Sequence, residues 1–127
     1  MNNSSNSQEK CIVIRTKQET VARLGSLYEA VRWCWRINID RAQKADYVLA
    51  VVNYGNREFK VEKIFKPTEW HCITAKECTG KKAPTCTCKT KPCGRICFTG
   101  ERAGAEIEKR YLGKIITMSQ NPVRYLY

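Results

Sequence analysis

The run YVLAVV, Tyr47 to Val52, is apolar at every position and is the strongest structural signal in this 127-residue sequence. Unbroken apolar character over such a length is typical of a central strand that is covered on both faces of its sheet. Asp46 precedes the run, and Asn53 to Asn56 follow it with residue types that tolerate positive φ. The pattern therefore predicts a buried strand that turns through a tight hairpin into an antiparallel neighbour.

The segment after the hairpin, Glu58 to Phe65, alternates between apolar and charged residues. Phe59 and Val61 fall on one face, but Ile64 breaks the alternation by one position. A slip of one residue is what a β-bulge produces, and bulges bend small sheets toward barrels. We therefore expect a bent strand here.

Capping residues and helical spacing mark the other elements. Ser26 and Glu29 form a capping box for a helix predicted from about Leu27 to Cys34, and Asp40 is placed to cap a short helix over Arg41 to Ala45. The sequence does not decide whether a turn of helix also forms over Glu19–Leu24. Further predicted elements are strands at Cys11–Ile14, Gly94–Gly100, Lys114–Met118 and Val123–Tyr127, and a helix at Ala103–Leu112 that ends at Gly113.

Together these elements predict one α+β domain over residues 11–127, preceded by a disordered polar tail at residues 1–10. The domain is expected to be a bent antiparallel sheet or a small β-barrel with two or three short helices. A Cys- and Lys-rich insertion interrupts it at about residues 72–93.

The charge balance favours a polyanionic partner. Lysine and arginine total 23 against 12 acidic residues, which gives a net charge of +11. The positive electrostatic field of such a charge favours nucleic acid as the first candidate partner and an anionic membrane surface as the second. The alternative is a solvated basic surface that binds no partner. Because no run approaches about 20 apolar residues and Met1 to Lys10 lack the apolar core of a signal peptide, we expect a cytoplasmic protein without a membrane span.

The eight cysteines suggest a metal site, because a reducing compartment favours thiols or metal thiolates over disulfides. Four of them have the spacing C-x7-C-x-C-x4-C and could bind zinc as thiolates, which would order the insertion. His71, Cys72 or Cys97 could replace one ligand. A flexible loop of reduced thiols and a set of disulfides are the alternatives. The predicted zinc ligands are Cys78, Cys86, Cys88 and Cys93.

Two arginines flank two tryptophans in Arg32-Trp33-Cys34-Trp35-Arg36, which offers flat rings for base stacking and guanidinium groups for phosphates. Helical phasing puts Trp35 on the stripe of Tyr28 and Val31, where core packing is its expected role, and leaves Trp33 as the stacking candidate. Asn121 to Tyr125 form a second cluster that could contact a base. A turn that only starts a strand explains this segment equally well. The predicted nucleic-acid-binding residues are Arg32, Trp33, Arg36, Arg41, Lys44, Arg124 and Tyr125.

Several runs carry a resemblance to known proteins: Leu27–Arg32 with Trp35, Arg41–Val51, Phe59–Val61, Trp70, Gly94–Gly100 and Asn121–Tyr125. The resemblance covers about residues 11–127 apart from Thr74 to Pro92. The order of these runs resembles that of small bacterial and phage proteins and is similar to the PUA-like superfamily, which includes PUA, ASCH, EVE, YTH and SRA-type domains. The resemblance implies a compact β-barrel-like core that binds RNA or DNA, often at a flipped or modified base.

The leading hypothesis is therefore a PUA-like domain that binds RNA or DNA. One alternative is a protein-interaction module whose zinc-ordered loop docks a partner protein, and another is an enzyme that processes nucleotides or nucleic acid. For the enzyme the sequence offers no recognisable catalytic constellation: His71 is the only histidine, and no nucleophile motif, phosphate-binding loop or paired carboxylates accompany it.

Overall fold

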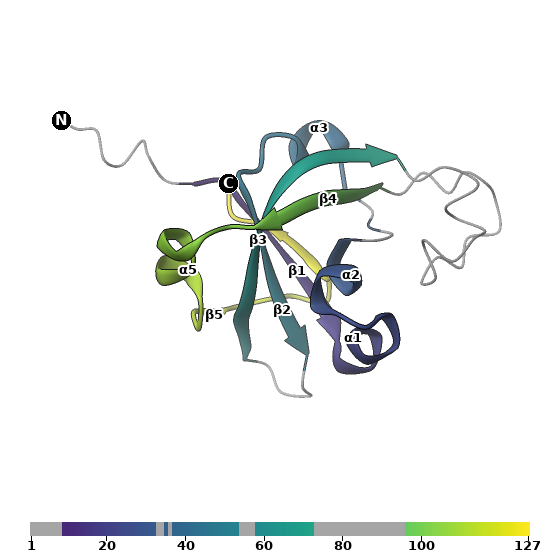
Figure 1. The fold of residues 1–127 in the computed structure, drawn as a ribbon, viewed down its shortest axis with the longest axis vertical. Coiled ribbons are helices and arrows are strands. Elements are labelled where there is room, and N and C mark those ends of the chain that lie inside the picture. The colour runs from purple at the N-terminus through teal and green to yellow at the C-terminus, as the bar shows by residue number, and fades with distance from the viewer. Residues whose placement is uncertain (1–8, 33–34, 36, 54–57, 73–95) are drawn as a thin grey trace.

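The structure is a computed structural model, and it describes residues 9–32, 35, 37–53, 58–72 and 96–127. Short helices lie around one central sheet (Figure 1). The elements are β1 (Cys11–Lys17), α1 (Gln18–Leu24), α2 (Leu27–Arg32), α3 (Ile39–Ala42), β2 (Tyr47–Asn53), β3 (Phe59–Cys72), β4 (Ile96–Arg102), α5 (Ala105–Tyr111), β5 (Ile115–Ile116) and β6 (Val123–Tyr125).

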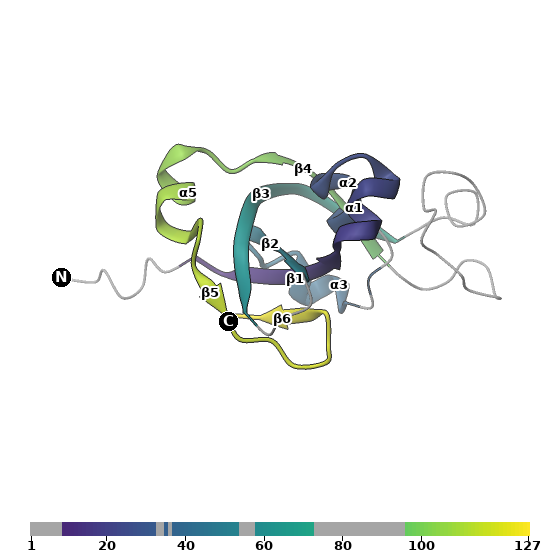
Figure 2. The ribbon, with the colours of Figure 1, turned by 90° about the horizontal axis from the view of Figure 1, so that it is seen from below.

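The strands form a mixed sheet with the order β4-β3-β2-β1-β6, and β5 pairs with the start of β3. The α+β class is confirmed, but the prediction of a wholly antiparallel sheet is wrong, because β1 and β2 are parallel. A parallel pair needs a long crossover, and α1, α2 and α3 lie between these two strands in the chain. The strands of the described ranges do not close into a barrel, although β3 curves strongly around the core (Figure 2).

The predicted central strand and bulge are both confirmed. β2 lies between β1 and β3, pairs antiparallel with β3, and is buried along almost its whole length. The register between β2 and β3 shifts so that Ala50 faces Lys63 while Val51 faces Val61, which leaves Glu62 as the extra residue. The turn at residues 54–57, which joins the two strands, lies outside the described residues.

The sheet separates two apolar clusters. Val48 and Ala50 of β2 belong to the first cluster, to which α2 and α3 also contribute, whereas Leu49 and Val51 belong to the second, against which α5 packs. The first cluster also contains Trp70, and Trp35 packs against it, so the core role predicted for Trp35 is confirmed. Ile107 and Tyr111 of α5 pack on the second cluster, and Gly113, which was predicted to end this helix, follows it with a φ of 81°.

The structure confirms the predicted N-cap of α2 but not the predicted N-cap of α3. The backbone N–H of Glu29 donates to Ser26 Oγ at 3.1 Å, as the capping box predicts. At α3, however, the cap is Asn38, whose Oδ1 accepts from the backbone N–H of Arg41 at 3.2 Å, and the prediction that Asp40 caps this helix is wrong. Asn38 lies three residues before Arg41, the spacing that a cap needs, and Asp40 is already helical.

We expect Ser26→Ala to lower the free energy of unfolding by about 1 kcal/mol, because it removes the acceptor for an N–H at the start of α2. Urea denaturation measures the change. Ser26→Asp keeps an acceptor at the same place and should retain most of the stability, so equal losses in both variants would show that the cap is not the cause.

No helix in the described part of the chain has the length and apolar composition that a membrane span requires.

Candidate functional site

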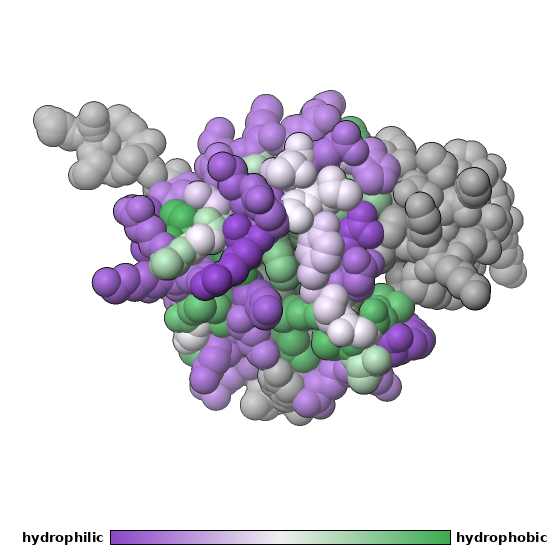
Figure 3. Space-filling view, viewed as in Figure 1, coloured by the Kyte–Doolittle hydropathy of each residue, from purple (hydrophilic) through white to green (hydrophobic). Residues whose placement is uncertain are grey.

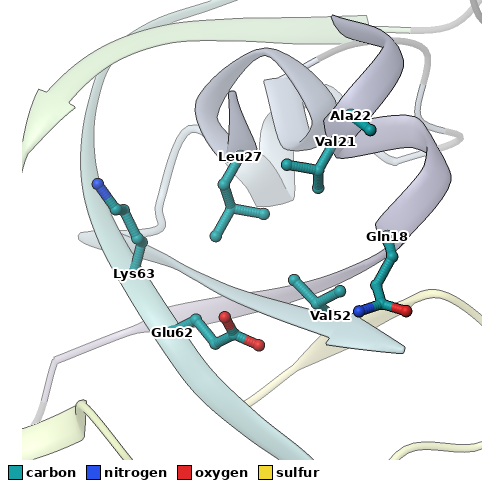
Figure 4. Close-up of a pocket in the computed structure, with 7 residues that line it drawn as sticks. All are labelled: Gln18, Val21, Ala22, Leu27, Val52, Glu62 and Lys63. Atoms are coloured by element: carbon teal, nitrogen blue, oxygen red, sulfur yellow. The ribbon is translucent and has the colours of Figure 1, made fainter. Parts of the chain in front are cut away.

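A pocket of about 420 Å³ opens between the first two helices and the middle of the sheet. We call it the bulge pocket. Figure 4 shows side chains from α1, α2, β2 and β3 around it. Its lining residues are Gln18, Val21, Ala22, Leu27, Val52, Glu62 and Lys63.

The β-bulge explains why two consecutive residues of β3 line this pocket. In a regular strand, successive side chains point to opposite faces of the sheet. Because Glu62 is the extra residue between the pairs Val51–Val61 and Ala50–Lys63, the alternation is suspended there, and both Glu62 and Lys63 line the pocket. Re-aiming a side chain in this way is a known use of bulges beside functional sites.

The pocket combines apolar walls with two polar groups. Val21, Ala22, Leu27 and Val52 supply the walls, and the surface between α1, α2 and the neighbouring end of β3 is visibly apolar (Figure 3). The polar groups are the Gln18 amide, which donates and accepts, and the Glu62 carboxylate, which accepts, whereas the Lys63 side chain lines the pocket with its ammonium pointing away from the other side chains (Figure 4). A volume of this size with few polar groups is typical of sites for small organic ligands.

A second feature, the Arg41 cluster, consists of Arg41 with the rings of Tyr125 and Tyr127. The Arg41 guanidinium carbon lies 3.9 Å from the Tyr125 ring centroid, and its Nη2 donates to the Tyr127 carbonyl at 2.6 Å. The Tyr127 hydroxyl in turn donates to the Arg41 carbonyl at 2.6 Å, and the two tyrosine rings meet edge to face. These contacts tie α3 to β6 and the segment after it.

The Arg41 cluster presents a fixed cation at the surface. Arg41 is exposed, and its guanidinium carries more N–H donors than the one that binds Tyr127. Burial, with the neighbouring Tyr125 as a smaller cause, raises the pKa of Tyr127 to about 12, so the hydroxyl keeps its proton at neutral pH and continues to donate. A guanidinium held in place on an aromatic ring is suited to binding a phosphate or another anion.

Of the predicted nucleic-acid-binding residues, the structure brings Arg41 and Tyr125 together. Arg32 is engaged elsewhere: its Nε donates to the Phe98 carbonyl at 3.0 Å, and its guanidinium pairs with Glu29. Arg124 donates to the Thr117 carbonyl, and Lys44 is exposed just after α3. Trp33 and Arg36 lie outside the described residues.

The predicted zinc ligands Cys78, Cys86, Cys88 and Cys93 also lie outside the described residues. Within the described ranges, no group of three or more Cys, His, Asp or Glu side chains could hold a metal ion. The structure does bring together two of the residues that the sequence offered as substitute ligands, His71 and Cys97.

Sequence reasoning did not find the bulge pocket, although it found one signal for it. The break in alternation at Ile64 predicted the bulge, but nothing in the local sequence indicated that Gln18 and Leu27 would lie opposite Glu62 and Lys63.

No protein-family model, curated protein or solved structure matches this chain.

Proposed function

We propose that the protein is a PUA-like nucleic-acid-binding domain that accepts one base in the bulge pocket. The observation that carries this proposal is the pocket itself: apolar walls on two helices and a strand, with the Gln18 amide and the Glu62 carboxylate as its polar groups. A nucleobase has two apolar faces and a polar edge, and it needs both kinds of contact.

The charge of the chain supports a nucleic-acid ligand over a neutral small molecule. The net charge is +11, and the connection between β3 and β4, residues 73–95, contains six lysine or arginine residues and Glu77 as its sole acidic residue. Phosphate groups attract such a segment, whereas a neutral ligand would gain little from it.

The Arg41 cluster supplies a contact to the phosphate backbone of a nucleic acid. Its guanidinium is positioned before any ligand arrives, so little side-chain freedom is lost when it binds a phosphate. In this account the Arg41 cluster contributes affinity, and the bulge pocket contributes selectivity for the base.

We expect Ala22→Phe, which places a ring in the bulge pocket from the exposed side of α1, to weaken binding of a single-stranded oligonucleotide about tenfold or more. Base contacts of this type are worth about 1–3 kcal/mol each, and a filled pocket loses them. Fluorescence anisotropy with labelled RNA and DNA of mixed sequence measures the effect and identifies the preferred nucleic acid.

The matched control is Ala105→Phe, which adds the same ring at an exposed alanine of α5. It should bind like the unmodified protein. Equal affinities for Ala22→Phe and the unmodified protein would show that the base does not enter the bulge pocket.

A further inference from the structure

The two polar side chains of the bulge pocket are a carboxylate and a neutral amide, and neither is a group that binds phosphate well. Gln18, at the start of α1, carries the amide, and Glu62, the extra residue of the β-bulge, carries the carboxylate. Figure 4 shows their polar ends on either side of Val52. The pocket therefore has its own recognition chemistry, different from that of the Arg41 cluster.

Both polar side chains are available to a ligand. In the part of the chain that the structure describes, no hydrogen bond or ion pair engages the side chain of Gln18 or of Glu62. Lys63 follows Glu62 in β3, but its ammonium points away from the other lining side chains. The Glu62 carboxylate therefore keeps its negative charge and its capacity to accept hydrogen bonds.

A carboxylate in a site for nucleic acid contacts groups other than phosphates, because two anions repel each other. An ionised carboxylate only accepts hydrogen bonds, so its partner must be a donor. The donors of a nucleic acid are the N–H groups of the bases and, in RNA, the 2′-hydroxyl. The apolar walls formed by Val21, Leu27 and Val52 suit the flat face of a base better than a ribose, which favours a base N–H as the partner of Glu62.

The bases differ in the N–H groups along their pairing edge. Guanine presents N1–H and an N–H of its N2 amino group side by side, and the two oxygens of one carboxylate can accept both, as they do from an arginine fork. Adenine and cytosine present an amino N–H beside a ring nitrogen that is an acceptor. Uracil and thymine present N3–H between two carbonyl oxygens. A carboxylate is repelled by these acceptors, so guanine is the base that it pairs with best.

We propose that the bulge pocket selects guanine, with the Glu62 carboxylate accepting from N1–H and the N2 amino group and the Gln18 amide donating to O6. The inference rests on the proposed function, because it requires a base in the bulge pocket, and it adds which base the pocket takes. The apolar walls contact the ring of any base, so the selectivity comes from Glu62 and Gln18.

Changing the base tests this inference without altering the protein. The probes are short labelled strands of uridine, or of thymidine if DNA binds more tightly, with one central position changed to guanine, hypoxanthine or 7-deazaguanine. Guanine should raise the affinity about tenfold or more, as one bidentate contact does. Hypoxanthine lacks the N2 amino group and should lose most of this gain, whereas 7-deazaguanine keeps the whole pairing edge and should retain it. Equal affinities for guanine and hypoxanthine would overturn the inference.

A variant then tests whether Glu62 is the residue that reads this edge. Glu62→Gln keeps the size of the side chain but replaces one acceptor oxygen with an N–H donor, so the ratio of guanine affinity to hypoxanthine affinity should fall toward one. Glu101→Gln removes the same charge from an exposed position on β4 and should leave the ratio as it is in the unmodified protein. A ratio that does not change in Glu62→Gln would overturn the inference, and circular dichroism checks the fold of both variants.

The Ala22→Phe variant separates a failure of this inference from a failure of the proposed function. If Ala22→Phe weakens binding while guanine, hypoxanthine and uracil bind alike, the pocket takes a base without selecting guanine, and the inference alone is overturned. If Ala22→Phe leaves the binding of every strand unchanged, no base enters the bulge pocket, and the proposed function fails together with the inference.

Discussion

Replacing Phe98 with alanine is expected to lower the free energy of unfolding by about 3–5 kcal/mol, the range for removing a large buried ring. Phe98 has no exposed surface and is the largest of the fully buried side chains. Its ring centroid lies 5.0 Å from that of Trp70, 6.0 Å from that of Tyr28 and 6.4 Å from that of Phe65. Alanine would leave a cavity where α2, β3 and β4 meet, and the two strands around it have little room to close over it.

Chemical denaturation followed by tryptophan fluorescence measures this loss. Phe98→Leu keeps most of the volume and should cost clearly less than the alanine variant. A loss below about 1 kcal/mol for Phe98→Ala would mean that this aromatic group does not hold the helical layer to the sheet.

Raising the salt concentration from about 50 to 200 mM is expected to weaken nucleic-acid binding by about two to three orders of magnitude. Six phosphate contacts on duplex DNA correspond to about a thousandfold, and fewer contacts or a single strand to less. Anisotropy titrations at several salt concentrations give the slope of log affinity against log salt. Affinity that does not change over this range would contradict binding through phosphates.

The same titrations test the Arg41 cluster. Arg41→Ala should weaken binding of all sequences alike and make the slope shallower by about one, because one phosphate contact is lost. Lys109→Ala removes one positive charge from α5, on the side of the second apolar cluster, and should leave the slope nearly unchanged. Equal slopes for the two variants would show that only the overall charge matters.

Local patterns predicted much of the fold because each of them reports on its own neighbourhood. The run from Tyr47 to Val52 predicted the central strand, and the misplaced Ile64 predicted the bulge, since Phe59, Val61 and Ile64 all enter the second apolar cluster. The pairing of β1 with β2 is different: it joins residues 36 positions apart, as Cys11 with Tyr47, and no local pattern encodes its parallel direction.

The candidate site was less predictable for the same reason. The bulge pocket joins α1, α2, β2 and β3, and its polar groups become neighbours only when the sheet is assembled. Arg41 and Tyr125 were both selected for their chemistry, and the structure places one over the other across 84 positions of sequence. Arg32 had the same chemistry but donates to the Phe98 carbonyl, a contact that the sequence could not reveal.

The cap of α3 shows a smaller version of this limit. Asn38 and Asp40 are both good capping residues and stand two positions apart. Which of them starts the helix depends on where the chain enters α3, and in the structure the helix begins at Ile39 with Ile39 and Ala42 packed on the first apolar cluster.

The most direct measurement of a base in the bulge pocket is a methyl NMR titration of the protein with a short single-stranded oligonucleotide at low salt. If a base binds there, the methyl signals of Val21, Leu27 and Val52 should shift together and more strongly than those of Ile107 and Ile116, which belong to the opposite face of the sheet. Signals of Val21, Leu27 and Val52 that remain in place while the oligonucleotide is bound would contradict the account.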